Sequence, residues 1–288
     1  MPGGALDHLE WRTTSVLDRP ARYGVAGQGP PLVFLHGWWL GYKSYKRALK
    51  RLVSQGHRVY APALPGFAGT AELEPLDCTM PGYATWVLAF MDTVEIDEPV
   101  TLMGHSFGGG VAIRTAYQAT ERVSRLILVN SIGGSAWGRR GTVRALKERP
   151  LWDWGLHLRR DILPLRQATR VLPVLLEDLG PNVARHPRTV WRVAGLARRV
   201  SLIDELEALK QRRLPIVILW GASDKVIPER AFRDLCSAAG VGSADASCVT
   251  VEGNHTWLLA DPDGFAEVMT NVVDVAKQVD ELEQDEVS

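Results

Sequence analysis

A serine between two glycines, placed between a strand-like run and a helix-like run, constrains the fold of this chain most. The pentapeptide Gly-His-Ser-Phe-Gly spans residues 104–108, with the serine at Ser106. It directly follows the apolar run Pro99–Met103 and shortly precedes the helix-like segment Val111–Arg114. In such a turn the glycines leave room for a sharp change of direction that lifts the serine oxygen above a sheet. The context therefore predicts a nucleophilic serine at Ser106, with an ordinary turn serine as the alternative.

A serine hydroxyl is a weak nucleophile without a base and an orienting acid, and later segments supply both residue types. The buried-strand pattern Leu214–Trp220 ends at a turn that carries Asp224. A further strand-like run, Ala246–Val251, is followed closely by His255. We predict that Ser106 attacks, that His255 accepts its proton, and that Asp224 holds the imidazole in the required tautomer and stabilises the imidazolium.

The chain order serine, aspartate, histidine is that of the α/β-hydrolases. The chain resembles this superfamily from about Leu32 to its C-terminal helix. The matching segments are Val33–Trp38, Leu64–Phe67, the serine pentapeptide, Leu219–Asp224 and Gly253–His255. The resemblance implies an α/β-hydrolase fold, an α/β architecture with a mostly parallel sheet of the eight-stranded type flanked by helices. It also implies an oxyanion hole formed by the backbone N–H groups of Trp38 and Phe107.

Alternative interpretations apply to several of these residues. Asp224 is also positioned to cap a following helix. Some members of the superfamily carry the acid one strand earlier, here after Arg125–Val129, but residues 130–134 contain no carboxylate. His36 and His105 lie beside the predicted catalytic residues, and we interpret them as structural hydrogen-bonding residues.

Strand-like runs alternate with helix-length segments, which is the pattern of a sheet covered by helices on both faces. A helix is expected to begin at Thr79–Pro81 and to bury one apolar stripe, and another to begin at Asp261–Pro262. The expected strands are residues 12–17, 21–26, 32–36, 57–61, 100–103, 126–129, 214–220 and 246–251.

The stretch 131–200 breaks this alternation, because its five prolines divide it into short segments. In the superfamily that the chain resembles, an insertion at this point is a helical cap over the active site. We therefore assign 131–200 to a cap, or lid, and 1–130 with 201–288 to the catalytic core. Ser201–Asp204 has the pattern of a capping box that begins the next core helix.

Tryptophans gather in the predicted cap and beside the catalytic motifs. A tryptophan brings a large apolar area with one N–H group, so these residues predict a pocket for a bulky hydrophobic or aromatic group. The alternative is that those in the cap fix it to the core. The pocket candidates are Trp39, Trp137, Trp152, Trp154, Trp191 and Trp257.

The predicted cap is basic, with fourteen Lys and Arg residues against five Asp and Glu residues. One interpretation is that it attracts an anionic substrate, and the other is that it is a solvated surface that pairs with the acidic remainder. The whole chain has a formal net charge of zero, so charge gives no indication of a nucleic-acid partner and none is expected.

The remaining composition bears on location and cofactors. The segment Met1–Val16 lacks the pattern of a secretory signal, and no apolar run approaches the roughly 18 residues of a transmembrane span. The three cysteines are odd in number and widely spaced, which predicts reduced structural thiols rather than a disulfide framework or a metal site. The cytoplasm is the expected compartment, and no metal and no organic cofactor are expected.

The leading hypothesis is a serine hydrolase that cleaves a carboxylic ester of a hydrophobic small molecule through an acyl-enzyme. Within the same superfamily, a carbon–carbon bond hydrolase, a thioesterase or a perhydrolase would use the same three residues. A small-molecule-binding protein on a retained hydrolase scaffold is the non-enzymatic alternative. No motif encodes the acyl and alcohol specificity or the oligomeric state.

Overall fold

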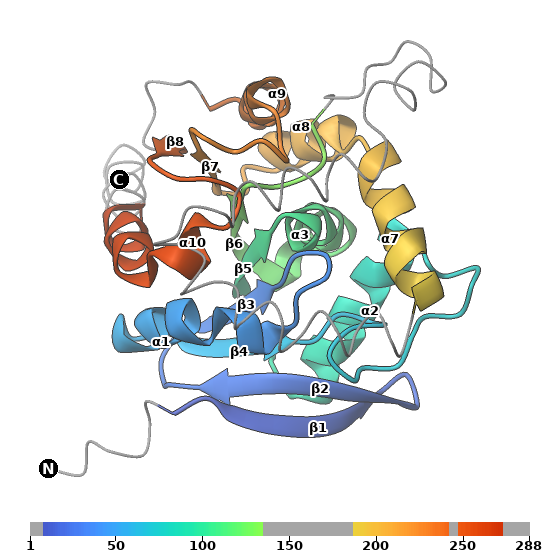
Figure 1. The fold of residues 1–288 in the computed structure, drawn as a ribbon. Coiled ribbons are helices and arrows are strands. Elements are labelled where there is room, and N and C mark those ends of the chain that lie inside the picture. The colour runs from blue at the N-terminus through green and yellow to red at the C-terminus, as the bar shows by residue number, and fades with distance from the viewer. Residues whose placement is uncertain (1–7, 135–186, 242–246, 273–288) are drawn as a thin grey trace, which may run out of the picture.

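An eight-stranded sheet forms the centre of the computed structural model, which describes residues 8–134, 187–241 and 247–272 (Figure 1). The strands are β1 (Glu10–Val16), β2 (Arg19–Ala26), β3 (Pro31–Leu35), β4 (Arg58–Pro62), β5 (Val100–His105), β6 (Val123–Val129), β7 (Ile216–Gly221) and β8 (Cys248–Val251). Their order across the sheet is β1-β2-β4-β3-β5-β6-β7-β8. The β1–β2 and β2–β4 pairs are antiparallel and the other pairs are parallel. The prediction of a mostly parallel sheet is confirmed.

Helices cover both faces of the sheet (Figure 1). On one face, a cluster of buried hydrophobic side chains packs the sheet against α1 (Lys46–Ser54), α10 (Trp257–Ala260) and a helix at 262–272. The cluster on the other face joins it to α2 (Met80–Thr93), α3 (Phe107–Gln118), α8 (Ile203–Gln211) and α9 (Glu229–Ala239). Two short 3-10 helices, η1 (Tyr42–Tyr45) and η2 (Thr120–Arg122), complete the core. Adjacent residues of β3 alternate between the clusters, because successive side chains of a strand point to opposite faces.

The three predicted helix starts in the core differ in outcome. The helix at 262–272 begins after Asp261, as predicted, and Oδ1 of Asp261 accepts a hydrogen bond from the N–H of Gly264 at 3.0 Å. Thr79 caps α2, and its hydroxyl accepts a hydrogen bond from the N–H of Gly82 at 3.1 Å. The capping box predicted at Ser201–Asp204 is wrong, since within the described residues α8 starts after Leu202 without a side-chain capping bond. The buried Leu202 instead donates its N–H to the carbonyl of Gly133 at 2.8 Å, so tertiary contacts fix this helix start.

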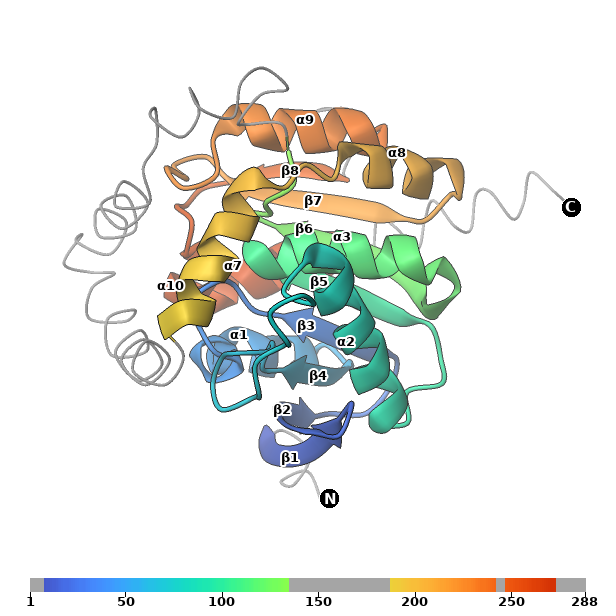
Figure 2. The same cartoon turned by 90° about the vertical axis from the view of Figure 1, so that its right-hand side faces the viewer.

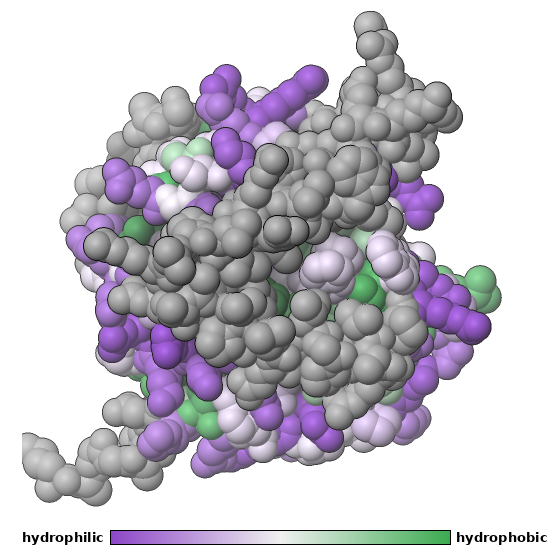
Figure 3. Space-filling view, in the orientation of Figure 1, coloured by the Kyte–Doolittle hydropathy of each residue, from purple (hydrophilic) through white to green (hydrophobic). Residues whose placement is uncertain are grey.

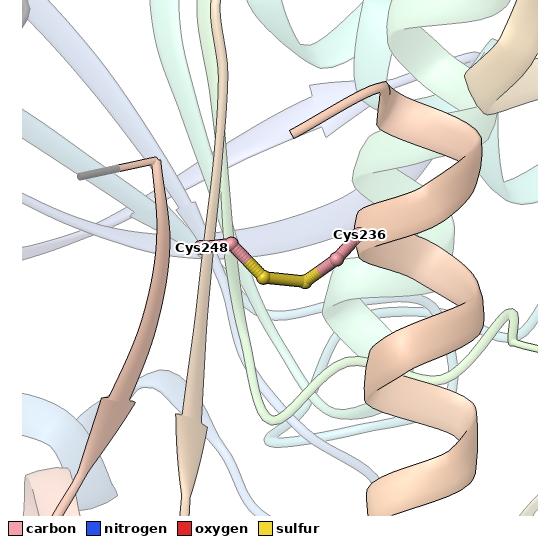
Figure 4. The surroundings of a disulfide bond; sticks show 2 residues. All are labelled: Cys236 and Cys248. Carbon is pink, nitrogen blue, oxygen red and sulfur yellow. A yellow bond between two sulfur atoms is a disulfide. The ribbon is translucent and has the colours of Figure 1, made fainter. Parts of the chain in front are cut away.

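A disulfide joins Cys236 of α9 to Cys248 of β8 (Figure 4). The prediction of three reduced thiols is therefore wrong for these two residues, and Cys78 is the free cysteine. The packing of α9 against the edge of the sheet brings the two Cα atoms to 6.1 Å, a proximity that spacing along the chain does not reveal. Because disulfides persist in oxidising compartments, the predicted cytoplasmic location loses the support of its cysteine argument and stays a prediction.

The described part of the predicted cap beyond residue 134 is α7 (Pro187–Arg199), which lies near the start of α3 (Figure 2). Its side chains Val190, Val193 and Ala197 join the cluster that contains α2 and α3. The rest of the cap lies outside the described residues, so the division into core and cap stays a prediction.

Hydrophilic residues occupy much of the coloured rim of the molecule in Figure 3, and hydrophobic residues are visible in small areas. Among the helices that the structure describes, none is both long enough and apolar enough to cross a membrane.

Candidate active site

Ser106 lies at the sharp turn between β5 and α3, as the sequence predicts. Its backbone has the left-handed φ of 54°, which is unusual for a residue with a side chain. A Cβ atom at Gly104 would lie 2.3 Å from the carbonyl oxygen of Gly108. A Cβ atom at Gly108 would lie 2.2 Å from the carbonyl oxygen of Leu35 at the end of β3. Glycine is therefore a steric requirement on both sides of the serine.

The structure brings Ser106, Asp224 and His255 together from the ends of three different strands. The Nε2 atom of His255 lies 3.0 Å from the hydroxyl oxygen of Ser106, and its Nδ1 atom lies 2.8 Å from Oδ2 of Asp224. All three side chains are buried. An ionised carboxylate only accepts hydrogen bonds, so Nδ1 of His255 carries a proton and the unprotonated Nε2 faces the serine hydroxyl.

The two carboxylate oxygens of Asp224 have different partners. The alternative in which Asp224 caps α9 is not found, because the N-cap of α9 is Pro228 and has no side-chain capping bond. Oδ1 accepts from the backbone N–H groups of Val226 and Ile227 at 2.7 and 2.8 Å, which stabilises the turn before α9. Oδ2 accepts from His255 and from the side-chain amide of Asn130. Burial would raise the pKa of Asp224, but the charge of His255 and these hydrogen bonds outweigh it and lower that pKa. The carboxyl group is thus kept ionised.

Asn130 is a residue of the site that the sequence reasoning missed. It follows β6 with a left-handed φ of 45° and is completely buried. Its Nδ2 donates to Oδ2 of Asp224 at 2.5 Å, and its Oδ1 accepts from Nε1 of Trp257 at 2.8 Å. The available signal was an asparagine, which tolerates a left-handed backbone, directly after the strand Arg125–Val129 that the alternative position of the acid would follow.

The turn after β3 lies against the serine. A Cβ atom at Gly37 would lie 3.3 Å from the Cβ atom of Ser106, so the predicted oxyanion turn passes next to the nucleophile. Phe107 is the first residue of α3, and the first N–H groups of a helix have no acceptor within it. The N–H groups of Trp38 and Phe107 therefore belong to segments that adjoin Ser106, while their role as an oxyanion hole stays a prediction.

The six pocket tryptophans have different outcomes. Trp39 stacks on Trp38 with ring centroids 4.4 Å apart and stays a pocket candidate. Trp257 is buried, packs on Phe265 and donates to Asn130, which bonds to Asp224, and its place in the pocket stays a prediction. Trp191 is 58% exposed and lies outside the packed face of α7, and its place in the pocket stays a prediction. Trp137, Trp152 and Trp154 lie outside the described residues.

His36 and His105 are hydrogen-bonded as expected for structural histidines. The N–H of Leu64 donates to Nε2 of His36 at 2.9 Å, and Nδ1 of His36 lies 2.9 Å from the carbonyl oxygen of Gly37. His105 bonds to Tyr45 and to the backbone carbonyl of His255. Within the described residues, no group of three or more His, Cys, Asp or Glu side chains is arranged to hold a metal ion.

Comparisons with known proteins bear on the family and the fold of the chain. A sequence model described as "Alpha/beta hydrolase family" matches residues 32–268. A pimeloyl-[acyl-carrier protein] methyl ester esterase of Aeromonas hydrophila is 27% identical over 267 residues, which cover 86% of this chain and 96% of that protein. A 2-hydroxy-6-oxo-2,4-heptadienoate hydrolase of Pseudomonas putida is 26% identical over 217 residues, or 70% of this chain and 75% of that protein. The crystal structure of a membrane phospholipase A superposes with a TM-score of 0.74 at 20% identity, over 93% of this chain and 87% of that one.

Proposed function

Because this chain belongs to the alpha/beta hydrolase family, we propose that it is a serine hydrolase that cleaves a carboxylic ester of a hydrophobic small molecule. The observation that carries the proposal is the hydrogen-bonded path from Ser106 through His255 to Asp224, with distances of 3.0 and 2.8 Å. A serine oxygen in this position favours an acyl-enzyme intermediate.

In the proposed acylation step, Ser106 Oγ attacks the ester carbonyl carbon while its proton passes to Nε2 of His255. The ionised Asp224 stabilises the imidazolium that forms, and the N–H groups of Trp38 and Phe107 donate to the negative oxygen of the tetrahedral intermediate. The bond to the alcohol then breaks, and His255 returns the proton to the leaving alcohol.

Deacylation repeats the sequence with water as the nucleophile. A water oxygen attacks the acyl carbon, and its proton passes to Nε2 of His255. The second tetrahedral intermediate releases the carboxylic acid, and the proton returns to Ser106 Oγ. Every proton that is transferred passes through one nitrogen, so the neutral form of His255 with its proton on Nδ1 is the active form.

One feature supports a hydrophobic substrate, and another supports an ester. The stacked rings of Trp38 and Trp39 follow the turn that adjoins Ser106, and both pack partly against the apolar core. The relative from Aeromonas hydrophila is named as an esterase of a methyl ester. A preference for an acidic group on the substrate is a further part of the proposal, since α7 carries four arginines and no acidic residue.

Cleavage of a carbon–carbon bond is the second candidate function. It is favoured by the similarity to the hydrolase of Pseudomonas putida, whose name describes a dienoate substrate. The same three residues would serve either reaction, so a comparison of substrates distinguishes the two better than a mutation does.

The test measures initial hydrolysis rates on p-nitrophenyl esters from acetate to palmitate for the wild type, Ser106→Ala and Ser54→Ala. We expect Ser106→Ala to lower kcat by roughly 10⁴-fold or more, as removal of a catalytic serine does. Ser54→Ala is the matched control, since it removes an exposed hydroxyl of α1 that bonds to the carbonyl of Arg51. Near wild-type turnover by Ser106→Ala would overturn the nucleophile assignment.

A folded wild-type protein that is inactive on the whole series would contradict the ester proposal. Labelling of Ser106 by an organophosphonate in that case would direct the search to dienoate and thioester substrates. Saturable binding without labelling or turnover would instead support a binding protein.

A further inference from the structure

A chain of hydrogen bonds connects the turn after β3 to the loop that carries His255. The N–H of Gly37 lies 3.0 Å from the hydroxyl oxygen of Tyr45, and that oxygen lies 2.8 Å from Nδ1 of His105. On the other side of the ring, Nε2 of His105 lies 2.9 Å from the backbone carbonyl oxygen of His255. We call these groups the Tyr45–His105 relay.

The direction of each bond in the relay follows from the chemistry of its ends. A backbone carbonyl only accepts, so Nε2 of His105 carries a proton and donates to His255. In a neutral imidazole the other nitrogen is then an acceptor, so the hydroxyl of Tyr45 donates to Nδ1. A backbone N–H only donates, so Gly37 donates to the oxygen of Tyr45. The three bonds are mutually consistent and define one tautomer of His105.

The surroundings of His105 keep its ring neutral. Burial is the main effect that lowers its pKa to about 3, and the charge of His255 adds to it. His36 acts in the same direction, while Asp224 and the bond to the carbonyl of His255 oppose the shift. The relay therefore retains its tautomer when His255 becomes positively charged during a reaction.

The relay also packs against the turn after β3, in addition to its hydrogen bonds. Tyr45 and His105 are both buried, and their rings are 5.6 Å apart in an edge-on contact. A Cβ atom at Gly37 would lie 2.9 Å from Nδ1 of His105 and 3.1 Å from the hydroxyl oxygen of Tyr45. The turn is thus packed directly against the relay and against Ser106.

The relay spans parts of the sheet that are not neighbours. The turn follows β3 and His255 follows β8, and β5, β6 and β7 lie between these strands. The connection passes through His105, the residue directly before Ser106. One buried hydrogen-bond network therefore connects the backbone of the turn to the backbone of His255, and it passes through the residue next to the nucleophile.

We propose that Tyr45 and His105 are positioning residues that hold the oxyanion turn and the His255 loop in fixed relation at Ser106. The kinetic part of this inference rests on the proposed function, because it concerns the oxyanion turn and the general base of that reaction. Neither residue takes part in proton transfer. Their effect is to keep the donor turn and the base correctly oriented, where a displacement of about 1 Å costs up to 100-fold in rate.

The first experiment compares Tyr45→Phe with Tyr83→Phe. We expect Tyr45→Phe to lower kcat by about 10- to 100-fold with KM within about twofold, because catalytic groups rather than binding groups are displaced. Tyr83→Phe is the matched control, since it removes a buried hydroxyl that donates to the carbonyl of Pro65 at 3.2 Å. It should leave kcat within about twofold of the wild type. An unchanged kcat in Tyr45→Phe, or an equal loss in Tyr83→Phe, overturns the proposal.

The second experiment combines Tyr45→Phe with His105→Phe. Residues that act through one relay are coupled, so the double variant should lose no more activity than the more impaired single variant. If the two losses multiply, the residues act independently and the proposal is wrong.

A third measurement needs no variant and no substrate. Nitrogen NMR of the wild type with labelled histidine should show His105 in the neutral form with the proton on Nε2 at pH 7. The form with the proton on Nδ1, or a charged ring, would contradict the relay. Because this result does not depend on turnover, the relay and the proposed function can fail separately.

Discussion

The two sides of the candidate active site are held in place by different physical means. On the nucleophile side, sterics fix the backbone, because neither Gly104 nor Gly108 has room for a Cβ atom. On the acid–base side, side-chain hydrogen bonds hold Asp224, including the bond from Asn130. A steric requirement allows one residue type, whereas a hydrogen bond can be supplied by several. The nucleophile side is therefore expected to appear in the sequence as a motif of fixed residue types, whereas the acid–base side is not.

The variant with the largest expected effect, a loss of kcat, lies on the acid–base side and is Asp224→Asn. The amide presents a donor to His255 and favours the wrong tautomer, so we expect kcat to fall by about 10⁴-fold, or about 5 kcal/mol. The fold should be retained, since the side chain keeps its shape. Steady-state kinetics measure the effect, with Asp92→Asn on the surface of α2 as the control. A loss below tenfold would mean that another group orients His255.

On the nucleophile side, Gly108→Ala should act on stability. The new Cβ atom would meet the carbonyl oxygens of Leu35 and His36 at 2.2 and 2.6 Å, and backbone atoms cannot rotate away. We expect a loss of about 4 kcal/mol in the free energy of unfolding, above the usual cost of overpacking. Denaturant unfolding measures it. Gly195→Ala in α7 is the control, because its Cβ atom would approach the end of the Arg199 side chain at 3.3 Å.

We expect Gly195→Ala to be neutral or stabilising by up to about 1 kcal/mol, as for a glycine inside a helix. If both alanine variants were equally stable, the steric account of the nucleophile side would be wrong.

The disulfide between Cys236 and Cys248 is a covalent bond on the acid–base side, and removing it tests whether it stabilises the fold there. It closes a loop with a sequence separation of 12, for which chain entropy predicts about 3 kcal/mol of stability. Replacing Cys236 and Cys248 together by alanine should lower the free energy of unfolding by about that amount, and reductant should lower it similarly in the wild type. Cys78→Ala serves as the control. Equal stability of the oxidised and reduced proteins would contradict this role.

The smallest effect is expected for Asn130→Ala. Asp224 keeps its bonds from His255, Val226 and Ile227, so we expect a loss of about tenfold in kcat, or about 1.4 kcal/mol. Asn130→Gly separates the amide from the backbone, because glycine adopts the left-handed φ of 45° freely. Equal losses in both variants assign the effect to the amide. A loss confined to the alanine variant would assign it to the backbone.

The same comparison explains how much could be predicted from the sequence. Each expected strand is present. The strands β3, β4, β5 and β7 are mostly buried and are local apolar runs, whereas β1 is mostly exposed. The bounds of a strand are less certain where a run is interrupted: β6 begins at Val123 rather than near 126, since Ser124 and Arg125 are polar. The strand–turn–helix around Ser106 was predictable because its glycines are a local requirement.

The support of Asp224 was not predictable in this way. Asn130 is 94 residues from Asp224 and 127 residues from Trp257, so no local pattern connects them. The proximity of Cys236 and Cys248 likewise depends on how α9 packs. Trp257 was predicted to line the pocket because it flanks the catalytic motif, and its hydrogen bond to Asn130 could not be predicted from the sequence.

The bond between Trp38 and α7 has a consequence for how this protein can be altered. The ring N–H of Trp38 donates to the backbone carbonyl of Val190 at 2.9 Å. Every amino acid carries that carbonyl, so the identity of residue 190 is irrelevant to the bond. An insertion or deletion of one residue upstream within the same helix would instead turn the carbonyl by about 100° about the helix axis. Libraries that exchange or shorten this region should therefore preserve the helical phase and the buried side chains Val190, Val193 and Ala197, and vary the exposed side chains of the helix.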